Sequence, residues 1–164
     1  MTTPAFEKFK ILIEDPLKSI SADPKSLTNP TYLSGSIRHE ANALKKGING
    51  RKLPALIASY DADSINEQKV QPKTSRLHKD SYTVTSTRSV NIYGVVATID
   101  DNSEPGEYIL EIDELLHDVK RAIPFKDLKF VSAGFILDND DASLGLAGFL
   151  LKVTYDYTEK FNYD

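Results

Sequence analysis

The sequence predicts an α+β fold in which one helix packs on a face of a mostly antiparallel sheet. Apolar residues recur at helical spacing over 108–123. Two stretches rich in β-branched and aromatic residues, 128–137 and 144–157, follow this helix and read as strands. A third such stretch, 81–99, precedes it. A helix between strands of this kind is expected to cover one face of their sheet.

The N-terminal fifty residues predict a helical extension to a sheet-and-helix core over 51–160, within a single domain over 1–164. Pro4 suits the first turn of a helix, whereas Asp15-Pro16 is expected to kink or interrupt it. Clustered Pro, Ser, Asn and Asp then indicate a loop. The predicted elements are a helix over 2–20, a loop over 21–30, a second helix over 31–46 and a turn over 47–50.

A first strand is predicted over 53–60, followed by a long polar loop over 61–80. A structureless segment of this length is unusual inside a compact domain. We read it as an arm or long hairpin loop that orders on assembly, with surface disorder as the alternative. Residues 81–99 are long for one strand, so they form one long bent strand or two strands in line. Gly94 marks a bulge or a crowded contact in this stretch.

The net charge of −4 conceals an asymmetry between the two parts of the chain. Residues 1–99 hold 14 Lys and Arg against 9 Asp and Glu, whereas residues 100–164 hold 6 against 15. Both charge clusters can be read as solvated faces. The alternative is that one face of a subunit meets the opposite face of an identical neighbour, which closes a ring or extends a filament. Complementary charge would steer that contact.

This second interpretation nominates two sets of candidate residues. The expected subunit interface pairs a basic cluster with an acidic turn: Arg38, Lys45, Lys46, Arg51, Lys52, Asp138, Asp140 and Asp141. The carboxylates expected to face a channel or the adjacent subunit share one face of the 108–123 helix and its start: Glu107, Glu111, Glu114 and Asp118.

The sequence does not predict an enzyme. It has no cysteine, which excludes disulfides, thiolate nucleophiles and cysteine zinc sites. His39-Glu40 begins like a zinc-protease signature, but Ala43 stands where the second histidine is needed. Gly145 and Gly148 are not followed by a predicted helix, which a dinucleotide-binding fingerprint requires. We therefore expect no catalytic residues, no cofactor and no metal. No apolar run is long enough to cross a membrane, and the charged N-terminus does not predict a signal peptide.

Three segments together resemble the tail terminator (tail completion) proteins of long-tailed bacteriophages. The first is the Pro-led strand LPALIASY at 53–60, which follows a helix and a turn and precedes a polar loop. The second is the strand SVNIYGVV at 89–96, which leads into the helix LEIDELLHDVK at 110–120. The third is the closing strand FLLKVTYDY at 149–157. The resemblance covers about residues 50–157, and the preceding fifty residues are longer than the single leading helix usual in that family.

The resemblance implies a structural virion protein without catalytic activity. Such a protein forms a ring, usually of six subunits, that caps the finished tail tube and ends its polymerisation. Its implied partners are copies of itself, the tail tube protein and the head-connector protein, while DNA passes through without specific binding. The implied location is the tail–neck junction of the virion, after assembly in the host cytoplasm, with no membrane contact.

The residues leave other functions open. A different phage neck or tail joining protein shares parts of the pattern. A non-viral protein-binding module could use the 61–80 loop to hold a partner. An enzyme with a dispersed carboxylate site is a third class. The oligomeric state separates a ring from a monomeric binding module.

Overall fold

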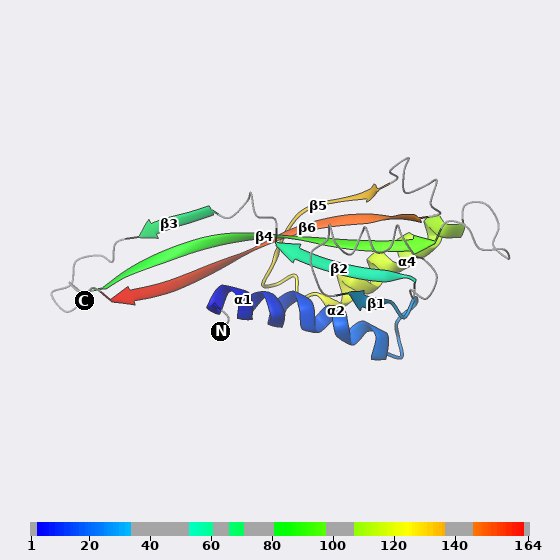
Figure 1. Cartoon of the computed structure of the whole chain (residues 1–164), viewed down its shortest axis with the longest axis horizontal. Helices are drawn as coiled ribbons and strands as arrows, with labels where there is room; N and C mark the ends of the chain where they lie inside the picture. The colour runs from blue at the N-terminus through cyan, green and yellow to red at the C-terminus, as the bar shows by residue number, and fades with distance from the viewer. Residues whose placement is uncertain are drawn as a thin grey trace.

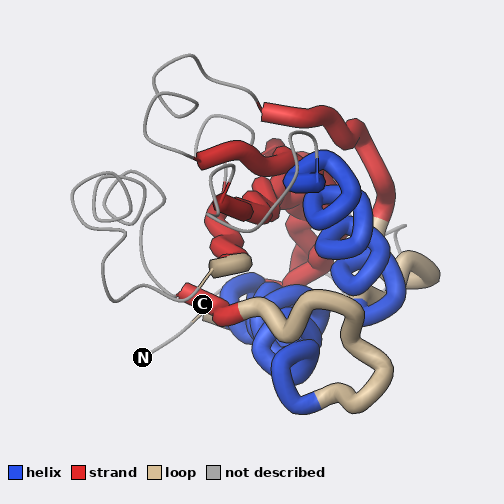
Figure 2. The backbone as a smooth tube through the Cα atoms, turned by 90° about the vertical axis from the view of Figure 1, so that its right-hand side faces the viewer, coloured by secondary structure: helices blue, strands red, loops and turns tan. Residues whose placement is uncertain are grey.

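The computed structural model describes residues 3–33, 53–60, 66–70, 81–97, 107–136 and 146–162. Within them, six strands form one sheet with helices packed on one face, which confirms the predicted α+β class (Figures 1 and 2). The path through the sheet is β1-β2-β4-β6-β5, and β3 pairs with β4 off this path. The strands are β1 (Thr31–Leu33), β2 (Ala55–Tyr60), β3 (Asn66–Val70), β4 (Ser81–Ala97), β5 (Lys129–Ile136) and β6 (Leu146–Asn162).

The N-terminal helical segment is continuous from residue 4 to residue 22, but its geometry changes near Pro16. Thr3 caps the first turn by accepting a hydrogen bond from the Phe6 amide at 3.3 Å. A proline has no amide hydrogen to continue a regular helix, and the wider π turn immediately precedes Pro16. The sequence therefore located the irregularity correctly. The parts are α1 (Pro4–Phe9), the π-helical η1 (Lys10–Glu14), α2 (Asp15–Ser19) and the 3-10 turn η2 (Ile20–Ala22).

The start of the predicted second helix is wrong, because residues 31–33 form strand β1. They pair in parallel with residues 55–57 of β2. Tyr32 packs against the main core and donates its hydroxyl to Glu14 Oε1 at 3.1 Å, whereas Leu33 packs with Ile57 in a second cluster. Successive side chains that point to opposite faces are typical of a strand. Here the backbone pairing with β2 decides that residues 31–33 form a strand. Residues 34–46 of the predicted helix lie outside the described residues.

Strands β4 and β6 form the centre of the sheet. Their antiparallel pairing runs without a shift from Ala97↔Leu146 to Ser81↔Asn162. The segment predicted over 81–99 is thus one long strand of 17 residues in its described part. Strand β6 extends five residues past Tyr157, where the predicted strand ended. The apolar alternation fades there, and backbone pairing with β4 continues the strand.

The predicted 61–80 loop contains a strand. Residues 66–70 form β3, which pairs antiparallel with residues 83–87 of β4, whereas residues 61–65 and 71–80 lie outside the described part of the chain. The sequence of β3, Asn-Glu-Gln-Lys-Val, has almost no apolar residues to signal a strand. Its pairing occupies the side of β4 that β6 leaves open, so backbone hydrogen bonding decides its structure.

The helix α4 (Glu107–Ala122) covers the sheet, as predicted, with one exception in its apolar stripe. Ile112, Leu115 and Val119 are fully buried against the strands, while Ile109 is half exposed. The helical spacing of apolar residues over 108–123 places Ile109 on the core face. Instead it lies in the first turn of α4, beside Leu110, which is also more than half exposed. The helical spacing of apolar residues alone does not show which turns of the helix bury their side chains against the sheet.

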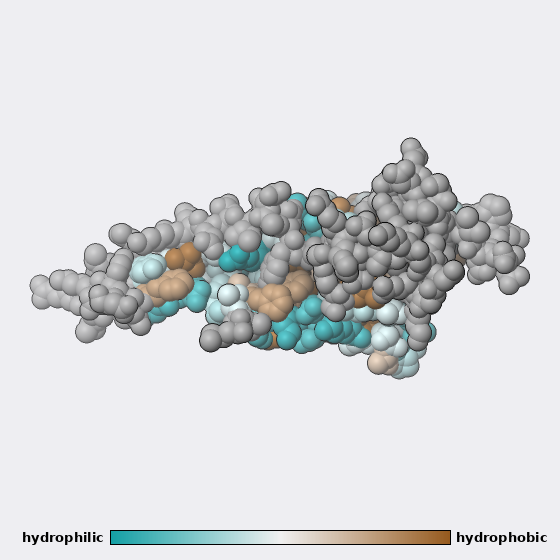
Figure 3. Space-filling model, viewed as in Figure 1, coloured by the Kyte–Doolittle hydropathy of each residue, from teal (hydrophilic) through white to brown (hydrophobic). Residues whose placement is uncertain are grey.

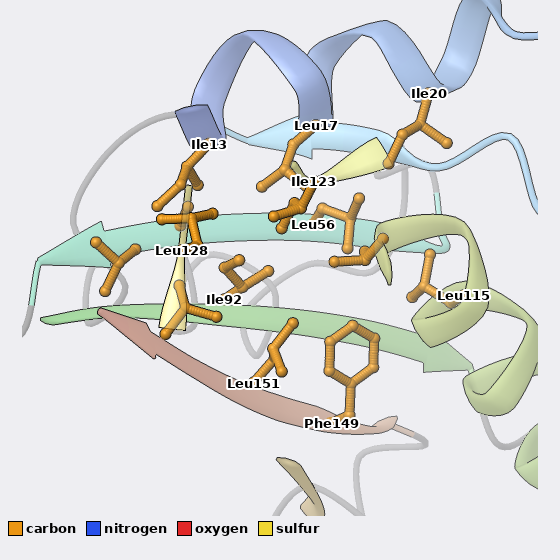
Figure 4. Packing of buried hydrophobic residues seen from close by; sticks show 14 of the residues in the cluster. Ile13, Leu17, Ile20, Leu56, Ile92, Leu115, Ile123, Leu128, Phe149 and Leu151 are labelled. Carbon is orange, nitrogen blue, oxygen red and sulfur yellow. The ribbon is translucent and has the colours of Figure 1, made fainter. Parts of the chain in front are cut away.

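A single buried cluster joins the N-terminal helical segment, α4 and one face of the sheet. Figure 4 shows Ile13 and Leu17 pointing from the N-terminal segment toward Leu56 of β2, with Leu115 of α4 and Phe149 of β6 in the same layer. The N-terminal helices therefore contribute directly to the core of the sheet. Burial of side chains of this size stabilises the fold by about 1.5–3 kcal/mol each.

Gly94 of β4 lies beneath the side chains of Phe149 of β6 and Leu115 of α4. A Cβ atom there would fall on the ring of Phe149 and would lie 2.8 Å from Leu115 Cδ2. The predicted crowded contact is therefore found at Gly94, and the β4–β6 ladder passes through it without a bulge. A bulge does occur elsewhere, in β5 between Phe130 and Ser132.

Candidate assembly surfaces

The basic cluster and the acidic turn are bounded by opposite edges of the sheet. The described chain stops at Leu33 of edge strand β1 and resumes at Leu53, just before β2. It stops again at Ile136 of edge strand β5 and resumes at Leu146 of β6. The candidate residues between these points lie outside the described residues: Arg38, Lys45, Lys46, Arg51, Lys52, Asp138, Asp140 and Asp141.

The start of β2 and the end of β5 lie at the same end of the sheet, whereas Leu33, where the described chain leaves β1, lies further toward the other end. Thr31 pairs with Ala55, and Ala55 pairs with Val95. Val95 pairs with Gly148, which in turn pairs with Ile136. One row of residues across the sheet thus connects the start of β1 with the end of β5. The sequence contains the two charge clusters, but only the strand order shows that the strands preceding them, β1 and β5, lie at opposite edges of the sheet.

The four candidate carboxylates of α4 do not share one environment. Glu107 begins the helix, and Glu111 and Glu114 are half-buried along its side. Asp118 is only 1% exposed. These residues lie along α4 beside its buried side chains, and the one nearest the C-terminal end of the helix, Asp118, is the most deeply buried.

The burial of Asp118 contradicts its predicted role as a carboxylate facing a channel or a neighbouring subunit. It accepts hydrogen bonds from Ser26 Oγ at 3.0 Å, from the amides of Leu27 and Thr28 at 3.1 Å each, and from Thr28 Oγ1 at 2.7 Å. Burial alone would raise the pKa of Asp118, but the hydrogen bonds from Thr28, Leu27 and Ser26 outweigh it and lower that pKa. Asp118 therefore fastens the loop after the N-terminal helices to α4.

A second contact supports the same attachment. Arg121 of α4 forms a hydrogen-bonded ion pair with Asp23, at the start of this loop. The side chains of both residues are about one-third exposed, so this pair contributes less than the buried Asp118 bonds. Neither contact has a signal in the sequence, because the partners are separated by about ninety residues or more.

Strand β5 presents an open edge that the sequence did not single out. All residues from Lys129 to Gly134 are exposed. Phe130 and Val131 are large apolar side chains, with 54% and 51% of their surface exposed. Exposed edge strands are normally blunted, because their free backbone groups can pair with another chain. Two consecutive apolar residues, Phe130 and Val131, interrupt the alternation of apolar and polar residues expected in a strand. This interruption was the signal in the sequence for the exposed edge.

The end of the sheet away from the charge clusters extends into an arm. We define the arm as β3, residues 81–87 of β4 and residues 156–162 of β6. In it, β4 is the middle strand and pairs with β3 on one side and β6 on the other (Figure 1). Tyr82 and Phe161 stack on it with ring centroids 5.4 Å apart. Phe161 is 38% exposed, and Figure 3 shows an apolar patch on this part of the surface. The arm thus offers apolar surface beyond the core.

The base of the arm is attached to the N-terminal helix. Tyr155 of β6 is buried, and its hydroxyl donates to the carbonyl of Ala5 at 2.8 Å. Lys8 Nζ donates to the carbonyl of Asp156 at 2.6 Å and lies 5.8 Å from the centre of the Tyr155 ring. These contacts determine where the free part of the arm begins.

The described residues provide no grouping of three or more metal-binding side chains. None of the helices in the described ranges has the length and apolar character needed to span a bilayer. No known protein-family profile matches the chain, and no curated protein matches it in sequence. The features available for a functional argument are therefore the two sheet edges, the charge beside them and the arm.

Proposed function

We propose that this protein is a ring-forming structural subunit that caps the tail tube of a long-tailed bacteriophage. In this role it ends polymerisation of the tube and docks to the head connector. Copies associate head-to-tail, most simply as six subunits around an axis. The assembled ring belongs to the tail–neck junction of the virion, and it has no catalytic activity.

The observation that carries this proposal is that the strands at opposite edges of the sheet, β1 and β5, each lead in sequence into a charged segment, and that the two segments have opposite charge. A heterologous ring contact needs two different, complementary surfaces on each subunit. The segment between β1 and β2 supplies five cations, and the segment between β5 and β6 supplies three aspartates. Because β2 begins and β5 ends at the same end of the sheet, neighbours related by rotation about a ring axis can bring these two chain ends to one level.

The arm supports a second class of contact. A capping ring binds copies of itself and also another component of the tail. The arm lies at the opposite end of the sheet from the charged segments, and it carries exposed Phe161 stacked on Tyr82. Lateral contacts and the contact with the tube or connector can therefore use separate regions of the subunit.

A ring of this kind has a lumen through which DNA passes without being bound. Carboxylates along a lumen would repel phosphate. Because Asp118 is buried, the remaining candidates of α4 for this lining or for the subunit interface are Glu107, Glu111 and Glu114.

The proposal is tested by measuring the mass of the purified protein with light scattering and by imaging it in negative stain. We expect closed rings whose mass is a multiple of the 18.3 kDa chain. The double reversal Arg51→Glu with Lys52→Glu should abolish the rings, and adding Asp138→Lys with Asp140→Lys should restore them. The matched control is Lys10→Glu in the N-terminal helical segment with Lys25→Glu in the loop after it, which should leave assembly unchanged. A protein that stays monomeric at high concentration would contradict the proposal.

A further inference from the structure

Among the described strands, the main path of the sheet ends in β1 on one side and β5 on the other, and these two strands run in opposite directions. β5 is antiparallel to β6, β6 to β4, and β4 to β2, whereas β1 is parallel to β2. Three reversals separate the two outer strands, so β1 runs against β5. When copies of the sheet are placed side by side in the same orientation, β5 of one copy meets β1 of the next in antiparallel fashion. This is the pairing that joins most neighbouring strands in sheets.

The β5 edge carries few of the features that normally prevent such pairing. It has no proline, and its one charged residue is Lys129 at its start. Gly134, near its other end, has no atom within 4 Å of the position that a Cβ would occupy. The bulge at Val131 is its one irregularity, and it leaves residues 132–136 in continuous pairing with β6. Phe130 and Val131 would lose solvent exposure if a further strand were added.

We propose that β5 pairs with β1 of the adjacent copy, so that the sheet continues from subunit to subunit. This inference rests on the head-to-tail ring proposed above and identifies the strands that form its contact. Backbone hydrogen bonds along the edge provide the attachment, as they do when a peptide adds a strand to a sheet. Phe130 and Val131 provide the apolar surface that the neighbour covers.

Charge selects β1 of a neighbour, rather than a second β5, as the occupant of this edge. In the β5–β1 arrangement, Ile136 and Thr31 lie at the same end of their sheets, because one row of pairs connects them in each copy. The ends of the described chain at this level, Ile136 of one copy and Leu53 of its neighbour, lead in sequence into segments of opposite charge. A β5–β5 contact is two-fold, so it places the two acidic turns at opposite ends of the pair and stops at two copies through this edge.

The absence of native cysteine allows a direct test by disulfide trapping. Leu33→Cys is combined in turn with Gly134→Cys, which lies in the same row of residues across the sheet, and with Ser132→Cys, two residues away on β5, in the full-length protein. Residues opposite each other on adjacent antiparallel strands have Cα atoms about 4.5–5.5 Å apart, which suits a disulfide. We expect at least one double variant to form a reducible ladder of covalent multimers under oxidation. The three single variants should remain monomeric on the same denaturing gel.

Each other result has a defined meaning. Covalent dimers from Ser132→Cys or Gly134→Cys alone would show a two-fold β5–β5 contact and overturn the proposal. Rings in negative stain without a ladder in either double variant would overturn the strand pairing and leave the ring itself standing. A chain that remains monomeric by light scattering would overturn both.

A second measurement uses charge on the edge. Val131→Lys adds a lysine of the kind that protects natural edge strands, and we expect it to weaken self-association about tenfold or more. Ile11→Lys is the matched control, because Ile11 is 64% exposed and belongs to the helical element η1 rather than to an edge strand. Circular dichroism confirms that both variants are folded. Equal assembly of the two variants would contradict a role for β5.

Discussion

The carboxylate of Asp118 accepts a 2.7 Å hydrogen bond from the hydroxyl of Thr28, a residue 90 positions earlier in the chain. Asp118 belongs to α4, and Thr28 belongs to the loop between the N-terminal helices and β1. Both amides beside this hydroxyl, those of Leu27 and Thr28, also donate to the same carboxylate. A buried anion therefore determines where the chain passes from the helical layer to the edge of the sheet.

Replacing Asp118 by alanine should destabilise the protein by about 2–4 kcal/mol, because hydrogen bonds to a charged group are lost and several donors are left buried. Urea unfolding followed by circular dichroism measures the change. Asp113→Ala is the control, since Asp113 is exposed on the same helix and its replacement should change stability by less than about 0.5 kcal/mol. Equal effects of the two replacements would contradict the role given to Asp118.

The stabilisation from Asp118 should disappear in acid. Its pKa in the folded protein is held below the usual 3.8. A carboxyl group with a lowered pKa contributes stability above its unfolded-state pKa, and this contribution is lost as the pH falls through the folded-state pKa. We therefore expect the difference in urea midpoint between the wild type and Asp118→Ala to be constant near neutral pH and to narrow below about pH 4. A difference that did not change with pH would exclude this origin.

Tyr155→Phe should cost about 1 kcal/mol, the usual net value of one buried hydrogen bond. It removes the hydroxyl that donates to the Ala5 carbonyl and keeps the ring in the core. The loss should be concentrated at the start of α1, where hydrogen exchange of the amides of residues 6–9 would become faster. Tyr157→Phe, at a half-buried position two residues further along β6, is the control and should leave this exchange unchanged.

Two glycines on different strands should respond differently to alanine. Gly94→Ala places a methyl group against Phe149 and Leu115, and overpacking of this kind costs about 1–3 kcal/mol. Gly134→Ala meets no atom within 4 Å, and it should be neutral or slightly stabilising, because alanine reduces the entropy of the unfolded chain. Thermal unfolding of the two variants gives the comparison. A tolerated alanine at 94 would show that α4 can move away from the sheet.

The sequence alone determined those elements whose side chains alternate in a regular way. The spacing of Ile112, Leu115 and Val119 identified α4, and the alternation of Phe149, Leu151 and Val153 identified the body of β6. These patterns are local, since the apolar residues that define one buried face of a helix or strand lie within a few positions of one another in the chain. The α+β class follows from them, because a one-sided helix and one-sided strands must bury their apolar faces together.

Only the tertiary structure decided the features that depend on residues distant in the chain. β1 and β3 are strands because β2 and β4 provide backbone partners, and Asp118 is buried because residues 26–28 fold over it. The strand order likewise placed β1 and β5, the strands that precede the basic and acidic segments, at opposite edges of the sheet, which their positions in the sequence do not reveal. Backbone pairing and the burial of a charge depend on residues that are neighbours in space but distant in the chain. A local sequence pattern therefore does not reveal them.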